Sequence, residues 1–145
     1  MKARNVEIVA NEIAELKEEE LPPLKTGEIL IENDFTVISA GTERANLIQL
    51  PNTGTYEHGF PWRPGYSGSG RVVEIGDGVE NFKVGDRVVN NWGGHRSHTI
   101  KSAERILKIE DDSVDLMEAA FAHIACFPFL GVRKLAIQLG ESAMV

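Results

Sequence analysis

The sequence has little that could be cross-linked or set into a membrane. Its single cysteine, Cys126, excludes an internal disulfide and any metal site built from several thiolates. The apolar neighbours of Cys126 predict a packing role. No apolar run approaches the roughly 20 residues that cross a bilayer, so we expect no membrane partner. Residues 1–15 carry charges where a signal peptide would be apolar, and the predicted location is cytoplasmic.

Basic residues are in the minority. The chain has 15 Lys and Arg against 22 Asp and Glu, a net charge of −7. Nucleic-acid binding requires clustered basic side chains that neutralise phosphates, and the sequence has no such cluster, so no nucleic-acid partner is expected. With 145 residues, of which 42% are hydrophobic, the chain is long enough to bury one core.

Up to about Lys108 the sequence consists of short β-branched segments separated by Gly, Asn, Asp and Pro. This pattern predicts an all-β body. Residues 28–32 alternate imperfectly, which indicates a strand buried on both faces for part of its length. The predicted strands are 6–9, 14–19, 28–39, 70–75, 87–90, 97–101 and 106–109.

The periodicity then changes to that of helices. Ser113 is the predicted N-cap of a short helix that contains Glu118. Residues 121–139 form a long apolar stretch, with Pro128 at the expected start of a second helix. One face of that helix is expected to carry Val132, Leu135, Ala136 and Leu139.

The final segment, residues 140–145, reads Gly-Glu-Ser-Ala-Met-Val. A turn followed by small and apolar residues predicts the opening of a buried strand, which needs neighbouring strands on both sides. We therefore expect a β body followed by the beginning of an α/β domain. The expected division is residues 1–125 for the body and residues 126–145 for the connecting helix and the start of the second domain.

Four stretches of the chain occur in a distinctive order: GEILIENDFTVISAGTERANL, RPGYSGSGRVVEIGDGVENFKVGDRVV, GGHRSHTIKSAERILKI and DLMEAAFAHIA. They resemble the N-terminal, GroES-like domain of the medium-chain dehydrogenase/reductase superfamily. The second stretch is the most specific, because its glycine spacing ahead of Val-Gly-Asp-Arg-Val is hard to reach by chance. The resemblance implies a mainly β fold with short helices, a partly open barrel, followed by a connecting helix and the first strand of a nucleotide-binding Rossmann domain.

The resemblance also implies where a catalytic zinc would be held. In zinc-dependent members the ligands occupy the positions that here are Ala40, Tyr66 with Ser67, and His123. Alanine has no donor atom, and serine and tyrosine are poor zinc ligands at neutral pH. The four-cysteine lobe that holds a structural zinc is also missing after Trp92. We therefore expect no metal ligands and no zinc.

Hydroxyls, rings and one carboxylate remain near the expected cleft. The predicted catalytic residues are Thr42, Tyr66 and His123, because a hydroxyl, a phenol and an imidazole can each donate or accept a proton. The predicted substrate-binding residues are Glu43, Ser67, Trp92 and His95. Structural roles remain open: Thr42 could close a strand end, Glu43 could pair with a basic surface group, and His123 could be packed with one hydrogen bond.

The leading hypothesis is the substrate-side domain of a nicotinamide-dependent, zinc-independent oxidoreductase that acts on a small molecule: a carbonyl, an alcohol or a conjugated alkene. NAD(P) would be bound mainly by a domain outside this chain, so no cofactor-binding residue is assigned and the chain alone is expected to be inactive. The alternatives are a zinc-type alcohol or polyol dehydrogenase domain with replaced ligands, and a non-catalytic GroES-like binding or assembly module. The apolar face of the connecting helix is expected to favour homo-oligomers.

Overall fold

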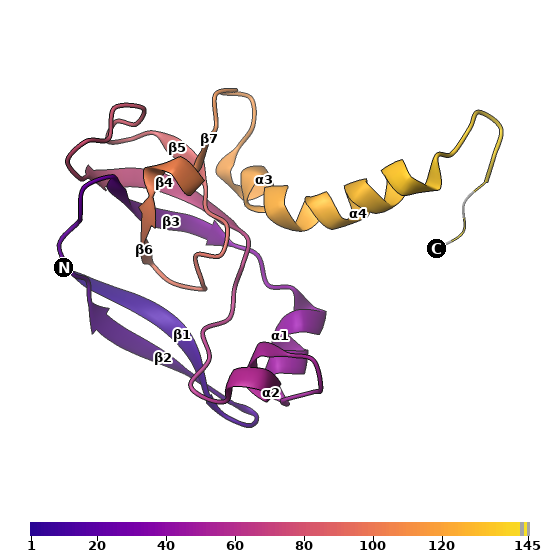
Figure 1. Cartoon of the computed structure of the whole chain (residues 1–145), viewed down its shortest axis with the longest axis horizontal. Helices are drawn as coiled ribbons and strands as arrows, with labels where there is room; N and C mark the ends of the chain where they lie inside the picture. The colour runs from indigo at the N-terminus through magenta and orange to yellow at the C-terminus, as the bar shows by residue number, and fades with distance from the viewer. Residues whose placement is uncertain (143, 145) are drawn as a thin grey trace.

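The computed structural model describes residues 1–142 and 144, and its strands form two antiparallel sheets (Figure 1). The smaller sheet is a hairpin of β1 (Lys2–Ala10) and β2 (Ile13–Glu20). The larger sheet has the order β6-β3-β4-β5-β7 and curves into a partly open barrel. Its strands are β3 (Glu28–Thr36), β4 (Gly68–Ile75), β5 (Arg87–Val89), β6 (His98–Ser102) and β7 (Leu107–Lys108). Every segment predicted as a strand between residues 6 and 109 overlaps one of these strands, and the mainly β fold is confirmed.

The core of the body lies on one face of the larger sheet. Ile29, Ile31, Val72 and Val88 are fully buried there, because alternate residues of adjacent strands point to the same side. Around them pack the partly buried side chains of Ile75, Val79, Phe82, Ala103 and Ile106, of which Ala103 belongs to the short 3-10 helix η1 (Ala103–Arg105). Leu30 is also buried, so the strand predicted to be buried on both faces is confirmed.

The hairpin joins the body through the backbone of β1. The Val6 N–H donates to the His95 carbonyl at 2.9 Å, and the Ile8 N–H donates to the Trp62 carbonyl at 2.8 Å. Arg63 adds an ion pair with Glu7, with Nε and Oε1 2.8 Å apart. The hairpin therefore lies against the loops at residues 62–64 and 95–97, which lead to several of the predicted site residues.

Two short helices, α1 (Ala40–Leu47) and α2 (Gly54–His58), form a lobe that the sequence did not predict. The strand expected over residues 28–39 ends at Thr36, and α1 begins shortly after it. The lobe is held by polar groups: the buried Asn46 accepts from the Thr55 N–H at 3.2 Å, and the Thr55 hydroxyl donates to the Asn46 carbonyl at 2.7 Å. Hydrophobic periodicity does not predict helices held by such polar contacts, because these helices have no apolar stripe in the sequence.

The C-terminal helices are α3 (Leu116–Ala120) and α4 (Ala122–Leu135), and their starts correct two predictions. The N-cap of α3 is Asp115, not Ser113, because Asp115 and Glu118 form a capping box. The Ser113 hydroxyl instead donates to the Asp111 carboxylate at 2.7 Å. Pro128 lies inside α4 and does not begin it.

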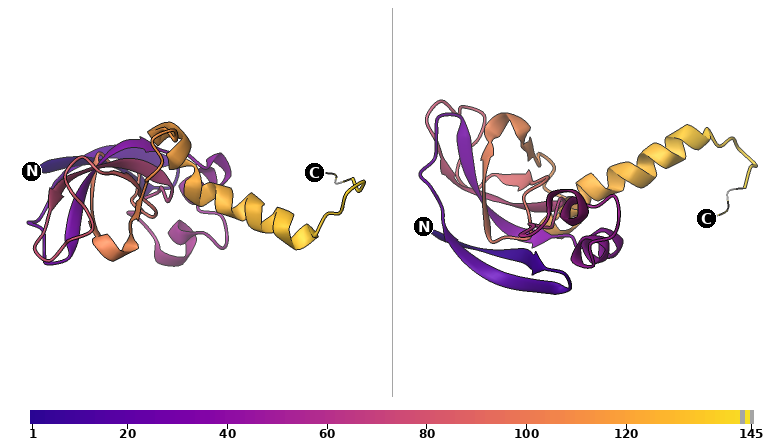
Figure 2. Two further views of the ribbon diagram at one scale, coloured as in Figure 1. Left: turned by 90° about the horizontal axis from the view of Figure 1, so that it is seen from above. Right: turned by 60° about the horizontal axis from the view of Figure 1, so that its bottom comes forward.

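Helix α4 projects from the sheets like an arm (Figures 1 and 2). None of its residues is buried, and the predicted packing role of Cys126 is wrong, because Cys126 is exposed. The described residues after α4, 136–142 and 144, contain no strand, and residues 143 and 145 of the strand predicted at 140–145 lie outside the described residues. Within the described residues, no helix combines the length and apolar character required of a membrane span.

Candidate functional site

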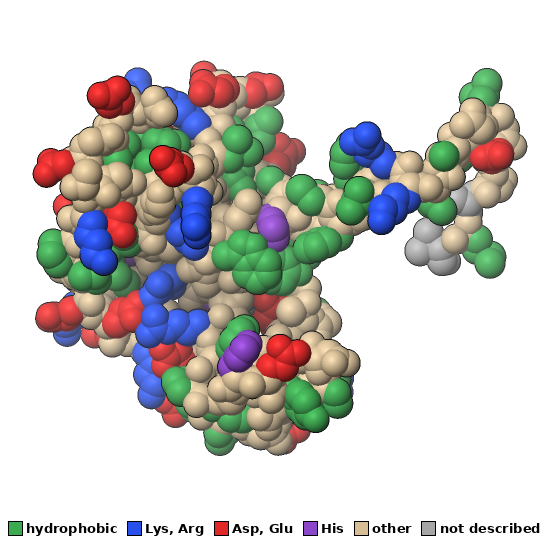
Figure 3. Space-filling model, viewed as in Figure 1, with side chains coloured by type: hydrophobic (Ala, Val, Ile, Leu, Met, Phe, Trp, Pro, Cys, Tyr) green, Lys and Arg blue, Asp and Glu red, His purple; other side chains and the backbone are tan. Residues whose placement is uncertain are grey.

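Four aromatic rings meet where α4 leaves the body. The His123 ring centroid lies 5.7 Å from that of Tyr66, 5.6 Å from that of Trp92 and 5.7 Å from that of Phe127. All three neighbours meet His123 edge to face, the geometry that aromatic quadrupoles prefer. Figure 3 shows a histidine among hydrophobic side chains at the root of the arm. We call these residues the ring cluster.

Backbone pairing sets the position of two members of the ring cluster. The Trp92 N–H donates to the Tyr66 carbonyl at 2.9 Å, which places the rings 5.5 Å apart. The Trp92 carbonyl in turn accepts from the Lys101 ammonium at 2.7 Å. Burial, followed by the charges of Arg105 and Arg96, lowers the pKa of Lys101. The third member, His123, comes from the first turn of α4.

Two buried serines hold the C-terminal helices against the sheet. The Ser67 hydroxyl donates to the Ala120 carbonyl at 2.5 Å, and the Ser69 hydroxyl donates to the Leu116 carbonyl. Only 3% of Ser67 is exposed. Since its proton is already donated to Ala120, Ser67 orients the start of α4 and hence His123. Its assignment as a substrate contact stays a prediction.

The predicted residues Glu43 and His95 form a separate pair. Glu43 Oε1 lies 3.3 Å from His95 Nε2, and His95 Nδ1 lies 3.0 Å from the Thr36 hydroxyl. The two side chains are only 15% and 10% exposed. Glu43 is therefore not the exposed surface carboxylate that its structural interpretation assumed. The pair borders a cavity of about 520 Å³, whose other walls are mostly apolar: Val6, Ile8, Ala14, Ile38, Leu47 and Pro64.

Thr42 lies on the first turn of α1 and is exposed. Its hydroxyl accepts from the Ser39 hydroxyl at 3.1 Å, and its carbonyl accepts from the Asn46 amide at 2.9 Å. No hydrogen bond within the described part of the chain joins Thr42 to the ring cluster. The structure therefore brings Tyr66, Trp92 and His123 together, pairs Glu43 with His95, and leaves Thr42 on a separate helix.

The residues present do not fit a catalytic zinc. Ala40 offers no donor atom, Ser67 donates its proton to the Ala120 carbonyl, and His123 alone cannot complete a tetrahedral site. Over the described residues, 1–142 and 144, no three or more His, Cys, Asp or Glu side chains are grouped so that they could hold a metal ion. We derive no chemical step through zinc.

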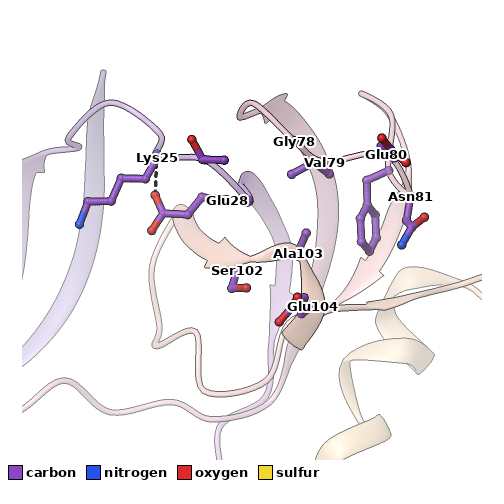
Figure 4. Close-up of a pocket in the computed structure, with 12 residues that line it drawn as sticks. Lys25, Glu28, Gly78, Val79, Glu80, Asn81, Ser102, Ala103 and Glu104 are labelled. Carbon is purple, nitrogen blue, oxygen red and sulfur yellow. Dashed lines mark hydrogen bonds between the residues drawn. The ribbon is translucent and has the colours of Figure 1, made fainter.

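A second cavity of about 520 Å³ lies at the opposite end of the larger sheet (Figure 4). It is formed by the start of β3, the turn after β4 and the residues after β6, with Lys25, Glu28, Val79 and Glu104 on its walls. The Glu28 carboxylate accepts from the Lys25 N–H at 2.9 Å, which braces the turn. None of the predicted site residues lines this cavity.

Sequence reasoning missed several residues that build the site. Phe127 was treated only as part of the connecting helix, although its ring lies 6.4 Å from that of Tyr66. Ser69 lies just before the predicted strand 70–75, and Thr36 and Lys101 were treated only as residues of predicted strands. The i, i+4 spacing of His123 and Phe127 on one helix was an available signal for that pair. The other three act through the fold and leave no local pattern.

A partly open antiparallel barrel, with short helices at one end and a longer helix leaving it, defines a GroES-like domain. Residues 25–131 match the family described as the alcohol dehydrogenase GroES-like domain. The chain belongs to this family, which is a family of oxidoreductases, and the resemblance to the medium-chain dehydrogenase/reductase superfamily is confirmed.

Individual relatives agree with this family. The chain is 36% identical over 78 residues to an alcohol dehydrogenase of Geobacillus stearothermophilus, covering 54% of this chain and 22% of the relative. It is 66% identical over 29 residues, 20% of this chain and 8% of the relative, to the (R,R)-butanediol dehydrogenase of Bacillus subtilis. The solved structure of a quinone oxidoreductase from Coxiella burnetii shares the fold, with a TM-score of 0.79 at 15% identity over 97% of this chain and 47% of that chain. The chain thus spans less than half the length of these relatives.

Proposed function

We propose that the chain is the substrate-side domain of a nicotinamide-dependent, zinc-independent oxidoreductase that acts on a carbonyl, an alcohol or a conjugated alkene. The ring cluster is the observation that carries this proposal. His123 and Tyr66 occupy positions that hold metal ligands in zinc-dependent members, yet here they pack against each other and against Trp92. His123 Nε2 is buried and has no hydrogen-bond partner among the described residues. A buried, unpartnered nitrogen is a favourable place for a substrate hydroxyl or carbonyl to bind.

The chemistry divides between the cofactor and this chain. NAD(P), when bound, supplies or accepts the hydride. The His123 imidazole holds or accepts the proton of the substrate oxygen at Nε2, and the Tyr66 phenol donates a hydrogen bond to the same oxygen. Trp92 and Phe127, whose rings contact that of His123, form the apolar side of the site next to that oxygen. Thr42 stays a predicted catalytic residue that this proposal does not use, because it lies on α1, apart from the ring cluster.

We propose that the nucleotide is bound mainly by a further domain, because the chain spans less than half of the relatives' length. In this proposal residues 1–125 form the substrate-side domain and residues 126–145 lead into the second domain. The chain alone would then lack hydride transfer. The proposed location is the cytoplasm.

The test uses a full-length protein that contains this chain, assayed for oxidation or reduction of NAD(P) with aldehydes, ketones, alcohols and enones. His123→Ala is expected to lower kcat by about 100-fold, the usual contribution of a general acid or base. Tyr66→Phe is expected to lower it by about tenfold, through loss of one charge-stabilising hydrogen bond. His58→Ala and Tyr56→Phe, on the exposed surface of α2, are the matched controls. Absence of hydride transfer with all four substrate classes, or equal effects of site and control variants, would disprove the proposal.

Metal content separates this proposal from the zinc-type alternative. After expression in zinc-rich medium, elemental analysis of the full-length protein is expected to find far less than one zinc per chain. Stoichiometric zinc that is lost in the His123→Ala variant would favour the zinc-type enzyme. A non-catalytic module would show neither zinc nor turnover.

We also propose that this chain associates with a second copy through α4. Phe127, Phe129, Leu130 and Val132 are each more than half exposed on that helix, and exposed apolar side chains in this number favour association. Sedimentation of the 145-residue chain is expected to show dimers or larger species that Leu130→Glu shifts toward monomer. Gln138→Glu, which adds the same charge beyond the helix, is the control. A chain that stays monomeric at high concentration would contradict the proposal.

A further inference from the structure

Asn5, on β1, is a buried amide without partners. Only 2% of the residue is exposed, and neither Nδ2 nor Oδ1 has a hydrogen-bond partner among the described residues. Exchanging the two atoms by a flip of the amide would leave both of them unpartnered. Because burying an amide without hydrogen bonds costs free energy, such groups nearly always have a partner.

The Asn5 side chain belongs to a cavity of about 180 Å³ where the hairpin meets the body. Arg63 and Gly65 line it from one loop, and Gly94 and Arg96 line it from the loop before β6. Arg96 Nε is also buried and has no partner among the described residues. Three unpartnered polar atoms, which come from β1 and from a loop, therefore belong to the walls of one small cavity.

The charges around this cavity cancel. Arg63 Nε lies 2.8 Å from Glu7 Oε1, and Arg63 Nη2 lies 2.9 Å from Glu19 Oε2. The Arg96 guanidinium also pairs with Glu19. Two guanidinium groups thus face two carboxylates. A bound anion would meet the carboxylates and a bound cation would meet the arginines, so the surroundings favour a neutral ligand.

The unpartnered atoms define the hydrogen bonds that a ligand must make. Asn5 Nδ2 and Arg96 Nε are donors, and Asn5 Oδ1 is an acceptor. A primary carboxamide is the neutral complement, because its oxygen accepts two hydrogen bonds and its NH₂ group donates. The cavity has room for about six water molecules of roughly 30 Å³ each, which is enough for a small amide. It is smaller than the roughly 300 Å³ or more that drug-sized ligands occupy.

We infer that this cavity binds a small primary carboxamide. Asn5 pairs with the carboxamide through two hydrogen bonds, and Arg96 Nε donates a third to its oxygen. Such a ligand would hydrogen-bond to both β1 and the loop before β6, and so join the hairpin to the body. The inference goes beyond the proposed function, since it requires neither NAD(P) nor turnover. Neither His123 nor Tyr66 lines the cavity, and Trp92 only borders it.

The experiment compares three ligands of one shape on the ¹⁵N-labelled 145-residue chain. Acetamide carries the NH₂ group, acetone has a methyl group in its place, and acetate has a charged oxygen. Acetamide is expected to shift the NMR signals of Asn5 Nδ2–H₂ and Arg96 Nε–H saturably, with a Kd on the order of 10 mM for so few atoms. Acetone and acetate should bind about tenfold more weakly, because they leave Asn5 Oδ1 without a donor.

Variants test the two residues separately. Asn5→Leu, followed at the Arg96 signal, is expected to weaken acetamide binding at least about tenfold through loss of two hydrogen bonds. Arg96→Lys, followed at the Asn5 signal, keeps the positive charge but lacks the Nε–H, and should weaken binding about fivefold. Asn81→Leu, at an exposed asparagine, is the matched control and should leave binding unchanged. If Asn5→Leu does not fold, Arg96→Lys and the three-ligand comparison still decide.

Three outcomes would overturn the inference. Acetone or acetate could bind as tightly as acetamide, or the variants at Asn5 and Arg96 could bind acetamide unchanged. A nuclear Overhauser contact between Asn5 Nδ2–H₂ and water that persists at saturating acetamide would show that water alone is its partner. None of these measurements involves hydride transfer, so failure of the inference and failure of the proposed function are observed independently.

Discussion

The sheet body buries its large apolar side chains, whereas helix α4 exposes them. Ile29, Ile31, Val72 and Val88 in the sheet are fully buried, whereas Phe129 and Leu130 on α4 are 64% and 53% exposed. The body is therefore stabilised by contacts within this chain. Helix α4 is ordered by its own backbone hydrogen bonds and by its root at the ring cluster, and the described residues of the chain leave its apolar side chains uncovered.

Truncating a core side chain should show this difference most strongly. Ile31→Ala is expected to lower the free energy of unfolding by about 4 kcal/mol, because the side chain is completely buried and the cavity cannot collapse. Leu130→Ala on α4 should change it by about 0.5 kcal/mol or less. Urea unfolding of both variants tests this. Equal losses would mean that α4 packs on the body in solution.

The second-largest expected effect on stability comes from the close approach of the β3 and β4 backbones in the body. A Cβ added at Gly70 would lie 2.0 Å from the Glu32 carbonyl oxygen, so β3 and β4 would have to separate. Gly70→Ala is expected to destabilise the chain by about 3 kcal/mol. In α1, where a Cβ on Gly41 meets nothing within 4 Å, Gly41→Ala should stabilise by up to about 1 kcal/mol. Thermal unfolding should therefore move in opposite directions for the two variants.

A smaller effect on stability is expected at the junction between the sheet body and the C-terminal helices. Ser69→Ala removes the donor to the Leu116 carbonyl and leaves that buried acceptor without its partner, a loss of about 1.5 kcal/mol. Ser113→Ala, at an exposed serine, should lose about 0.5 kcal/mol or less. Denaturant unfolding monitored by tryptophan fluorescence measures both. If the two variants lose the same stability, Ser69 does not hold α3 to the sheet.

The smallest effect concerns acid stability of the body. Burial acts to raise the pKa of Asp86, but hydrogen bonds from the Lys108 ammonium and the Lys83 N–H, with the charges of both lysines, outweigh it and lower the pKa below 3.8. This contribution to stability is complete above the ordinary carboxyl pKa and disappears as the pH falls through the lowered value. Wild-type stability should thus fall between about pH 5 and about pH 2 more steeply than that of Asp86→Asn. If the stability of both proteins fell equally with pH over this range, Asp86 would contribute nothing to acid stability.

Strand positions were predictable because they depend on local pattern. β-branched residues separated by Gly, Asn and Asp located all the strands between residues 6 and 109, and imperfect alternation at residues 28–32 indicated double-sided burial. The lobe of α1 and α2 was not predictable in this way, because Asn46 and Thr55 hold it through polar contacts. The N-cap at Asp115 was missed because Ser113 precedes the same apolar run and fits the same rule.

The sequence predicted which residues belong to the candidate site, but it did not predict which of them lie together. Tyr66, Trp92 and His123 come from residues far apart in sequence, and only the pairing of Tyr66 with Trp92 and the root of α4 bring them together. Glu43 and His95 were assigned beside them, but they form a pair of their own.

The sequence by itself determined the positions of the strands, the family and the lack of a donor atom at Ala40, because each depends on residue type and spacing. The tertiary structure alone decided that His123 stands among three rings and that Trp92 turns outward. Those features arise from long-range hydrogen bonds and ring contacts, which are made between segments that the chain order keeps apart.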